Sequence, residues 1–349
     1  MKFIFKYSFL FFISFAFAQE TSRHKVYLIG DAGEDTISGK ALLLLKNELL
    51  ANPNSSVVFL GDNIYPAGFH KNDQNSVLRL ESQLYILKEY RGNAFMIPGN
   101  HDWDAQRRKG VFVLNDQQVY VEKYLKQTTI KNKDSITFSP SSGLPGPEAI
   151  LLNNGLRLII IDTQWFLHFH SKEYVGSVKQ TKEKFQKELD SMLLRAKNDN
   201  EQVIIAAHHP IYSNGSHGKR KQPFRFLVNY TPFQIFGLMG INRLYAQDIS
   251  NPRYKRMRKQ FLSTINKYDN IIYVSGHDHN LQCFKENGNR FIVSGSGSKR
   301  SKLMKRKRFD SVFQDDKTTG FIKVEYEEKK YKSTTIYRVG EKEFILQDY

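Results

Sequence analysis

The chain has 349 residues, of which 40% are hydrophobic and 13% aromatic, and its formal net charge is +17. This hydrophobic content excludes a largely disordered chain, and the length suits one large α/β domain or two ordinary ones. The positive charge favours anionic partners such as phosphate esters, anionic lipid or nucleic acid, without choosing among them. Because Cys283 is the only cysteine, an intramolecular disulfide is excluded.

The first eighteen residues have the composition of a secretory signal. Two lysines precede an apolar run over residues 9–17, which ends in the small-residue site Ala16-Phe17-Ala18. The run is too short for a stable membrane anchor, and no later stretch approaches about 20 uninterrupted apolar residues. We therefore predict a signal peptide at residues 1–18 and an exported protein, either periplasmic or secreted. Without a disulfide, such a protein must rely on a large core, a bound metal or both.

Apolar runs alternate with amphipathic stretches in the first third of the chain, which is typical of βαβ units. Strands are predicted at residues 24–29, 57–60 and 94–97, and helices at residues 38–50, capped by Ser38, and 76–90. Each strand ends in polar residues, which are Gly30-Asp31, Gly61-Asp62-Asn63 and Gly99-Asn100-His101-Asp102. Open α/β folds bind their ligands at this carboxyl edge of a largely parallel sheet.

The rest of the chain adds further predicted helices and strands. Helices are expected at residues 115–126 and 181–197, and a further helix ends at 267. Strands are expected at residues 149–152, 156–161, 203–207, 270–275, 281–284, 290–293, 321–327 and 331–338. Two of these strands end in His208-His209-Pro210 and Gly276-His277-Asp278-His279. We predict one α/β domain over residues 19–349, a four-layer αββα sandwich of two mixed sheets flanked by helices.

Two segments depart from this pattern. Residues 219–258 mix aromatic and basic side chains and read as an insertion near the rim of the site. In the C-terminal region, residues 299–349, a basic loop precedes the last strands, and its run Lys299–Arg308 contains seven Lys or Arg. This run is either a solvated loop or a docking site for an anionic membrane surface or a polyanionic substrate. No nucleic-acid-binding signature accompanies it, so nucleic-acid binding is not predicted.

Side chains capable of binding metal follow the predicted strands. They are Asp31, Asp62, Tyr65, Asn100, His208, His277 and His279. Carboxylate, phenolate, amide and imidazole donors without thiolate suit iron, manganese or zinc. Two carboxylates and three imidazoles exceed the needs of one tetrahedral zinc site, so two ions that share a bridging carboxylate account better for the set. Such pairs, about 3.5–4 Å apart, serve phosphoryl displacement.

The order of these motifs, Gly-Asp, Gly-Asp-Asn-x-Tyr, Gly-Asn-His-Asp, His-His-Pro and Gly-His-Asp-His, resembles the calcineurin-like metallophosphoesterase superfamily. Tyr65, three residues after Asp62, makes the chain similar to the small mammalian-type (tartrate-resistant) purple acid phosphatases. The resemblance covers about residues 25–298. The chain departs from this family at Ala32, where an aromatic residue is common, and at Ser216, where an acidic residue is usual.

The resemblance implies a binuclear centre. A ferric ion, Fe(III), would be held by Asp31, Asp62, Tyr65 and His279. A divalent ion, iron, zinc or manganese, would be held by Asp62, Asn100, His208 and His277, with Asp62 bridging. His101 would bind phosphate and protonate the leaving group, or serve only as a hydrogen-bond donor beside Asn100. His217 resembles a second histidine of the substrate pocket, or is a plain loop histidine.

The expected function is an exported acid phosphatase that hydrolyses phosphomonoesters by in-line attack of a metal-bound hydroxide. A phosphodiesterase on the same scaffold with manganese or zinc is an alternative, and a non-catalytic protein that binds the cell envelope or anions is another. Asp102 and Asp278 are expected to support ligands, His209 to orient a strand end, and Asp162 to support the site or cap a turn.

Overall fold

In the computed structural model, the residues described are 23–141, 143–153, 155–169, 176–215, 247–347 and 349. The predicted signal peptide, His217 and most of the predicted insertion therefore lie outside the described residues. Helices in the described part are α1 (Lys40–Ala51), α2 (Gln74–Tyr85), α3 (Gly110–Gln127), α4 (Gln164–Leu167), α5 (Val178–Asn198) and α9 (Pro252–Ile265). No helix in these ranges is long and apolar enough to cross a membrane.

The described strands form two sheets. The first sheet contains β1 (Arg23–Ile29), β2 (Ser56–Phe59), β3 (Asn93–Met96), β4 (Ile136–Phe138), β12 (Gly320–Glu327), β13 (Lys330–Arg338) and β14 (Phe344–Gln347). Their order across the sheet is β14-β13-β12-β1-β2-β3-β4. Strands β1 to β4 run parallel, whereas β12 pairs antiparallel with β1, so the sheet is mixed.

The second sheet is also mixed. It contains β5 (Glu148–Asn153), β6 (Leu156–Ile161), β7 (Gln202–Ala207), β8 (Ile271–Ser275), β9 (Leu281–Glu286), β10 (Asn289–Ser294) and β11 (Phe313–Asp315). Their order is β11-β9-β10-β8-β7-β6-β5, with parallel pairs in the middle and antiparallel pairs toward both edges.

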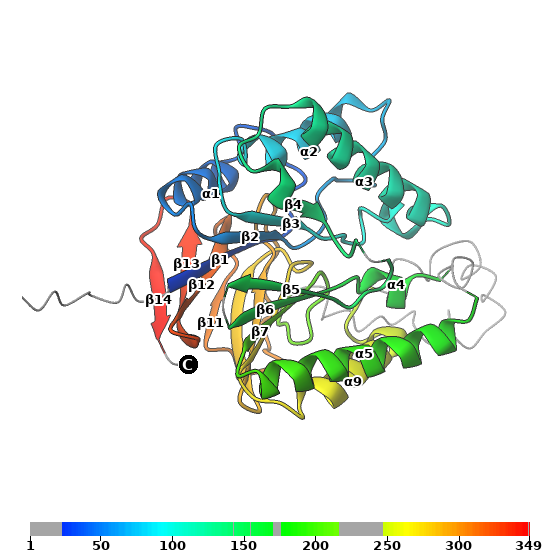
Figure 1. Cartoon of the computed structure of the whole chain (residues 1–349), viewed down its shortest axis with the longest axis vertical. Helices are drawn as coiled ribbons and strands as arrows, with labels where there is room; N and C mark the ends of the chain where they lie inside the picture. Colours follow the sequence, from blue (N-terminus) through cyan, green and yellow to red (C-terminus); the bar gives the residue numbers. More distant parts are fainter. Residues whose placement is uncertain (1–22, 142, 154, 170–175, 216–246, 348) are drawn as a thin grey trace, which may run out of the picture.

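The two sheets pack face to face between two layers of helices (Figure 1), which confirms the predicted sandwich. Alternate residues of each central strand face opposite ways, because side chains alternate along a strand. In β1, Val26 and Leu28 pack in the core between the sheets, whereas Tyr27 and Ile29 pack toward the helices. Burial on both faces explains why these strands are apolar runs in the sequence.

Several predicted boundaries are wrong. Ser38 does not cap the first helix, which begins at Lys40 after Gly39 and has no side-chain cap. The helix predicted at residues 115–126 begins earlier, at Gly110. Residues 252–258 of the segment interpreted as an insertion belong to α9. The side chain of Asn251 accepts a hydrogen bond from the Arg253 amide and Pro252 follows it, a combination that favours the start of a helix.

Candidate metal centre

The predicted donors lie together where central strands of both sheets end. Asp31, Asp62 and Asn100 follow β1, β2 and β3 of the first sheet, whereas His208 and the His277–His279 segment follow β7 and β8 of the second. Backbone hydrogen bonds join the two edges, for example from the Gly30 amide to the Ser294 carbonyl at 2.7 Å. Six of the seven donors are buried, and the His279 side chain is 18% exposed. The structure thus brings the whole predicted set to one place.

One group of donors surrounds the Tyr65 hydroxyl. This oxygen lies 2.9 Å from Asp31 Oδ1, 3.0 Å from Asp62 Oδ2 and 3.1 Å from His279 Nε2. His279 Nε2 also lies 3.4 Å from Asp31 Oδ1. A single phenolic proton cannot bond to all of these neighbours, and two carboxylates beside it repel each other when no positive charge lies between them. A cation at the centre of this group would compensate them.

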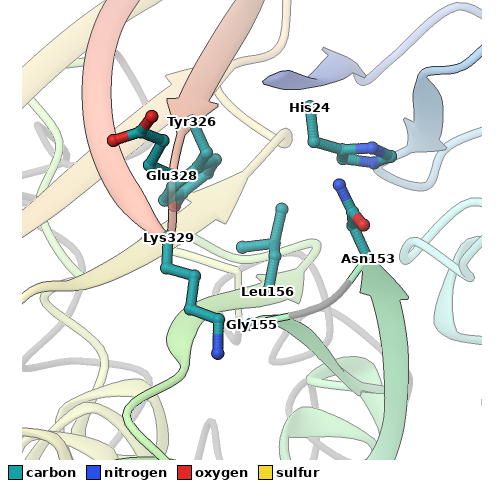
Figure 2. A pocket seen from close by; sticks show the side chains of 7 residues that line it. All are labelled: His24, Asn153, Gly155, Leu156, Tyr326, Glu328 and Lys329. Carbon is teal, nitrogen blue, oxygen red and sulfur yellow. The ribbon is translucent and has the colours of Figure 1, made fainter. Parts of the chain in front are cut away.

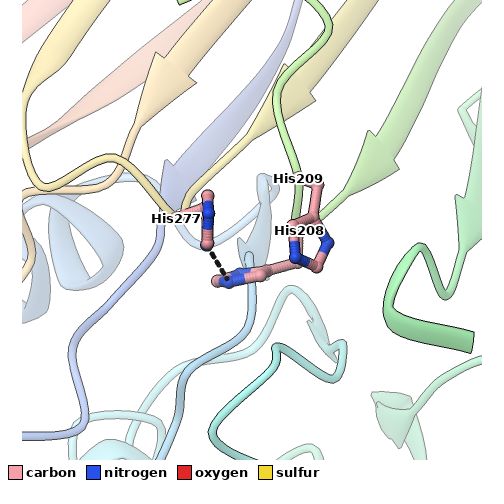
Figure 3. Close-up of side chains that lie close together, drawn as sticks. All are labelled: His208, His209 and His277. Atoms are coloured by element: carbon pink, nitrogen blue, oxygen red, sulfur yellow. Dashed lines mark hydrogen bonds between the residues drawn. The ribbon is translucent and has the colours of Figure 1, made fainter. Parts of the chain in front are cut away.

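A second group surrounds the side-chain oxygen of Asn100. Asn100 Oδ1 lies 3.1 Å from His208 Nε2 and 3.0 Å from His277 Nδ1, and these two nitrogens are 3.3 Å apart (Figure 3). Asp62 Oδ1 lies 3.4 Å from His208 Nε2. Asp62 therefore places one carboxylate oxygen in each group, as a carboxylate that bridges two ions does.

Hydrogen bonds on the far side of each ring orient these imidazoles. His208 Nδ1 lies 2.8 Å from the Leu60 carbonyl, and His277 Nε2 lies 3.2 Å from the Gln247 carbonyl. A carbonyl can only accept, so these ring nitrogens carry the protons. In the neutral rings, His208 Nε2 and His277 Nδ1 then have lone pairs that point at one spot, which is the arrangement that metal-binding histidines adopt.

Unusual backbone conformations at the strand ends allow the donors to lie close together. Asp31, Asp62 and His277 have positive φ angles of 58°, 53° and 70°, a left-handed conformation that costs free energy in residues other than glycine. Gly99 permits the close approach of the Asp62 loop, because a Cβ at position 99 would lie 2.3 Å from the Asp62 amide nitrogen. A strained backbone at three of the seven predicted ligands is typical of a functional site.

Charges in the site oppose one another. Burial disfavours ionisation of Asp62, but the imidazoles of His208, His101 and His279 hold the pKa of this carboxyl well below its usual range. Burial would lower the pKa of His208, but Asp62 and Asp31 raise it. Burial and the same two carboxylates raise the pKa of Tyr65 well above its usual value. A bound cation acts on this phenol in the opposite direction, because it stabilises the phenolate.

The supporting residues hold the ligand loops. Asp102 accepts hydrogen bonds from the backbone amides of Gly99 and Asn63, and burial raises the pKa of this carboxyl to about 7. Asp162 accepts from the amides of Gln164 and Trp165 at the start of α4 and from the Trp103 indole nitrogen. Asp162 thus caps a turn and also ties it to the loop after β3.

His209 faces other side chains beside the ligands. Its Nδ1 lies 2.8 Å from Thr163 Oγ1, and its Nε2 contacts Gln247 Oε1. The centroid of its ring lies 4.5 Å from that of the His277 ring (Figure 3). His209 therefore packs against a predicted ligand, and both of its nitrogens contact side-chain oxygens.

His101 lies at the mouth of the site. Its Nε2 is 3.9 Å from Asp62 Oδ2, its Nδ1 donates to the Pro66 carbonyl, and its side chain is 28% exposed. The ring packs on that of Tyr65, with centroids 4.4 Å apart. The proton on Nδ1 is thus directed at the protein, and Nε2 can face a substrate. The other predicted catalytic residue, His217, lies outside the described residues.

Two contributors to the site were not predicted. Gln247 orients His277 through its carbonyl and contacts His209 through its side chain, but it lies within the segment interpreted as an insertion. Lys299 holds its ammonium group 3.6 Å from the centre of the Tyr65 ring and 2.7 Å from Glu34 Oε2. A run of seven cations gives no sign of which one faces the site, so the sequence could not single out Lys299.

Comparison with known proteins agrees with this geometry. The model of the calcineurin-like phosphoesterase family matches residues 24–281. No curated protein is significantly similar to the chain in sequence. Among solved structures, GAP50, the anchor in the inner membrane complex of Plasmodium, is 19% identical with a TM-score of 0.57, and the match covers 93% of this chain and 88% of that one.

Two phosphatases have a similar fold. A dimetal phosphatase from Danio rerio is 13% identical with a TM-score of 0.53, and the match covers 93% of this chain and 98% of that one. Purple acid phosphatase PPD1 from yellow lupin (Lupinus luteus) is 14% identical with a TM-score of 0.52, over 94% of this chain and 54% of that one. At these identities the likeness shows the fold alone.

Proposed function

The chain belongs to the calcineurin-like phosphoesterase family, and we propose that it is an exported acid phosphatase of the purple type that hydrolyses phosphomonoesters. The broader statement, that it is a metallophosphoesterase with buried His and Asp groups able to bind metal, follows from the family and from the two groups of donors. The proposal adds the metals, the substrate class and the location.

The contacts of Tyr65 carry the proposal. Its hydroxyl, Asp31 Oδ1 and Asp62 Oδ2 place three oxygens that can be anionic in one group with His279. Three anionic oxygens suit a hard trivalent ion, so we assign Fe(III) to this group. The other group has one carboxylate, one amide oxygen and two imidazoles, which suits a divalent ion such as iron, zinc or manganese.

The ions, Asp62 and His101 would have different roles in hydrolysis. When bound, the two ions supply charge that stabilises the phosphoryl group in the transition state and acidify the attacking water. Asp62 fixes the spacing of the two groups, since one of its oxygens lies in each. His101 faces the opening with Nε2 and is placed to give a proton to the leaving oxygen.

A metal analysis with a visible spectrum tests the proposal. We expect one iron and one divalent ion per chain and an absorption band from phenolate-to-iron charge transfer. The Tyr65→Phe variant should lose this band, whereas Tyr120→Phe should keep it, because Tyr120 bonds to Glu81 away from the site. Activity with manganese or zinc alone, no visible band and a preference for diesters would instead support a phosphodiesterase.

The fold does not itself decide between enzyme and binding protein, because the similar GAP50 is described as an anchor. The complete set of donors favours an enzyme. A panel of mono- and diesters from about pH 4 to 8 distinguishes the two. If the metal-loaded protein cleaves none of them but binds anionic vesicles, the non-catalytic alternative is correct.

Export is the part of the proposal that the N-terminal sequence supports. The predicted cleavage site lies after Ala18, so the mature chain should begin at Gln19. Sequencing the N-terminus of the protein purified from the cell envelope or the medium tests this directly.

A further inference from the structure

The segment Lys299–Arg308, here called the basic loop, begins beside the proposed metal centre. The chain enters it from Gly297 and Ser298, whose amides donate to the carbonyls of Gly30 and Asp31, each at 3.0 Å. Within the loop, the Ser301 amide donates to the carbonyl of His279 at 2.7 Å. The first part of the loop is therefore fixed to two of the predicted ligands.

The far end of the basic loop is fixed to the loop that follows His208. The Met304 amide donates to the carbonyl of Asn214 at 2.9 Å. The Arg308 amide donates to Asn214 Oδ1 at 2.8 Å. Because Asn214 is fully buried, these bonds hold the end of the basic loop against the protein. A merely solvated loop has no need of attachment at both ends to the loops that bear predicted ligands.

Positive charge is concentrated in residues 302–308 of the loop. The exposed cations are Lys302, Lys305, Arg306, Lys307 and Arg308. None of these five forms an ion pair within 4 Å among the residues that the structure describes, and the loop contains no acidic residue. Their charge is therefore available to an anion that arrives at the mouth of the site. Arg258 adds a cation next to them, stacked on the rings of Tyr212 and Phe309.

We propose that the basic loop binds the additional phosphates of a substrate that carries several phosphate groups, of which one enters the metal centre. This inference rests on the proposed function. The two ions and His101 would bind the phosphate that reacts. The cations of the basic loop would bind the other phosphates of the same substrate. A membrane surface is the less favoured partner, because backbone hydrogen bonds attach the loop to His279 and to the loop that follows His208.

A pair of charge variants tests the proposal. The loop variant changes Lys302, Lys305, Arg306 and Lys307 to Gln, and leaves Lys299 in place because it contacts Tyr65. The matched control makes the same change in charge on α5, by replacing the exposed lysines Lys179, Lys184, Lys187 and Lys197 with Gln. The substrates are p-nitrophenyl phosphate, with one phosphate, and myo-inositol hexakisphosphate, with six.

We expect the KM for inositol hexakisphosphate to rise about tenfold in the loop variant, because four cations each contribute modestly at an exposed site. The KM for p-nitrophenyl phosphate should change less than about threefold, and the α5 control should match the wild type with both substrates. Added salt should weaken binding of the hexakisphosphate in the wild type more than in the loop variant. Equal changes for the two substrates, or none for the hexakisphosphate, would overturn the proposal.

A binding measurement separates this proposal from the proposed function. Isothermal titration with inositol hexasulfate, which is not a phosphate ester, should show weaker binding to the loop variant than to the α5 control, even in metal-free protein. If the wild type hydrolyses no phosphomonoester but this difference persists, the proposed function fails and the anion site remains. If the loop variant loses binding to phosphatidylserine vesicles while both binding of the hexasulfate and kinetics stay unchanged, the loop binds membranes and the proposal is wrong.

Discussion

His101 lies beside both carboxylate oxygens of Asp62, and its side chain remains 28% exposed. Its backbone amide donates to Asp62 Oδ1 at 2.8 Å, and its Nδ1 donates to the Pro66 carbonyl. The ring is further held by its contact with Tyr65. A histidine fixed on one side and open on the other can transfer a proton to a leaving group, whereas a purely structural histidine has no need of the open side.

Replacing His101 with Gln should therefore affect esters according to their leaving groups. For an alkyl ester such as glycerol 2-phosphate, whose alkoxide needs a proton, we expect kcat to fall about 100-fold to 1,000-fold. For p-nitrophenyl phosphate, whose phenolate leaves without a proton, the fall should be much smaller. Steady-state kinetics with both esters measures the difference, and His70→Gln, a half-exposed histidine outside both groups of donors, is the control.

An equal loss of kcat for the two esters would contradict this assignment. The His101 ring would then act by holding the Asp62 carboxylate, and not as the acid.

Strands and helices differ in how well the sequence predicts them. Strands buried on both faces, such as β2 and β8, are apolar runs whose ends are marked by Gly-Asp or Gly-His. β14 was not predicted, because most of its residues are exposed and it pairs at the edge of a sheet through backbone hydrogen bonds. One helix, predicted to start at residue 76, begins earlier, at Gln74, because the side chain of Asp73 caps α2.

A buried histidine, His24, should make the free energy of unfolding depend on pH. His24 of β1 is buried and its Nε2 lies 3.0 Å from Ser56 Oγ of β2. It lines a pocket of about 280 Å³ at the start of β1, together with residues that include Asn153, Glu328 and Lys329 (Figure 2). Burial lowers the pKa of His24 from 6.5 to about 4.

Acid should therefore destabilise the protein through His24. The unfolded chain binds the proton near pH 6.5 and the folded chain only near pH 4, so the stabilising contribution is complete above pH 6.5 and is lost as the pH falls toward 4. The free energy of unfolding should fall by up to about 3 kcal/mol across this range. Urea unfolding of the wild type and of His24→Gln at several pH values measures it, since the variant should lack this part of the pH dependence. An identical dependence in the two proteins would exclude His24 as its cause.

The arrangement of the whole molecule was only partly predictable. The sequence indicates strand ends that carry donors, and it predicts two sheets from the order of the elements. It does not give the order of strands within a sheet, because β12 pairs with β1 across about 300 residues. The convergence of the donors depends on that order. Asp31 and His277 approach each other, with the His277 amide 2.7 Å from Asp31 Oδ2, only when the two sheets are packed.

The proposed metal centre therefore spans both sheets. Asp31, Asp62, Tyr65 and Asn100 come from the first sheet, whereas His208, His277 and His279 come from the second. The core between the sheets, which includes Val58 and Ile204, holds the two edges in register. An ion bound by donors of both sheets binds the folded chain and not the unfolded one, so it should stabilise the whole fold.

Removal of the metal should lower the melting temperature. A ligand present at about 1,000 times its Kd stabilises a fold by about 4 kcal/mol, which for a chain of this size corresponds to a fall of several degrees in melting temperature on chelation.

Asp62→Asn should show little further fall in melting temperature on chelation, because the carboxylate with an oxygen in each group is gone. Asp116→Asn, on the exposed face of α3, should respond like the wild type. Differential scanning fluorimetry with and without chelator, beside a metal analysis of each protein, measures these differences. A wild type that loses two ions without any change in melting temperature would mean that the ions do not link the sheets, because binding confined to the folded state must raise its stability.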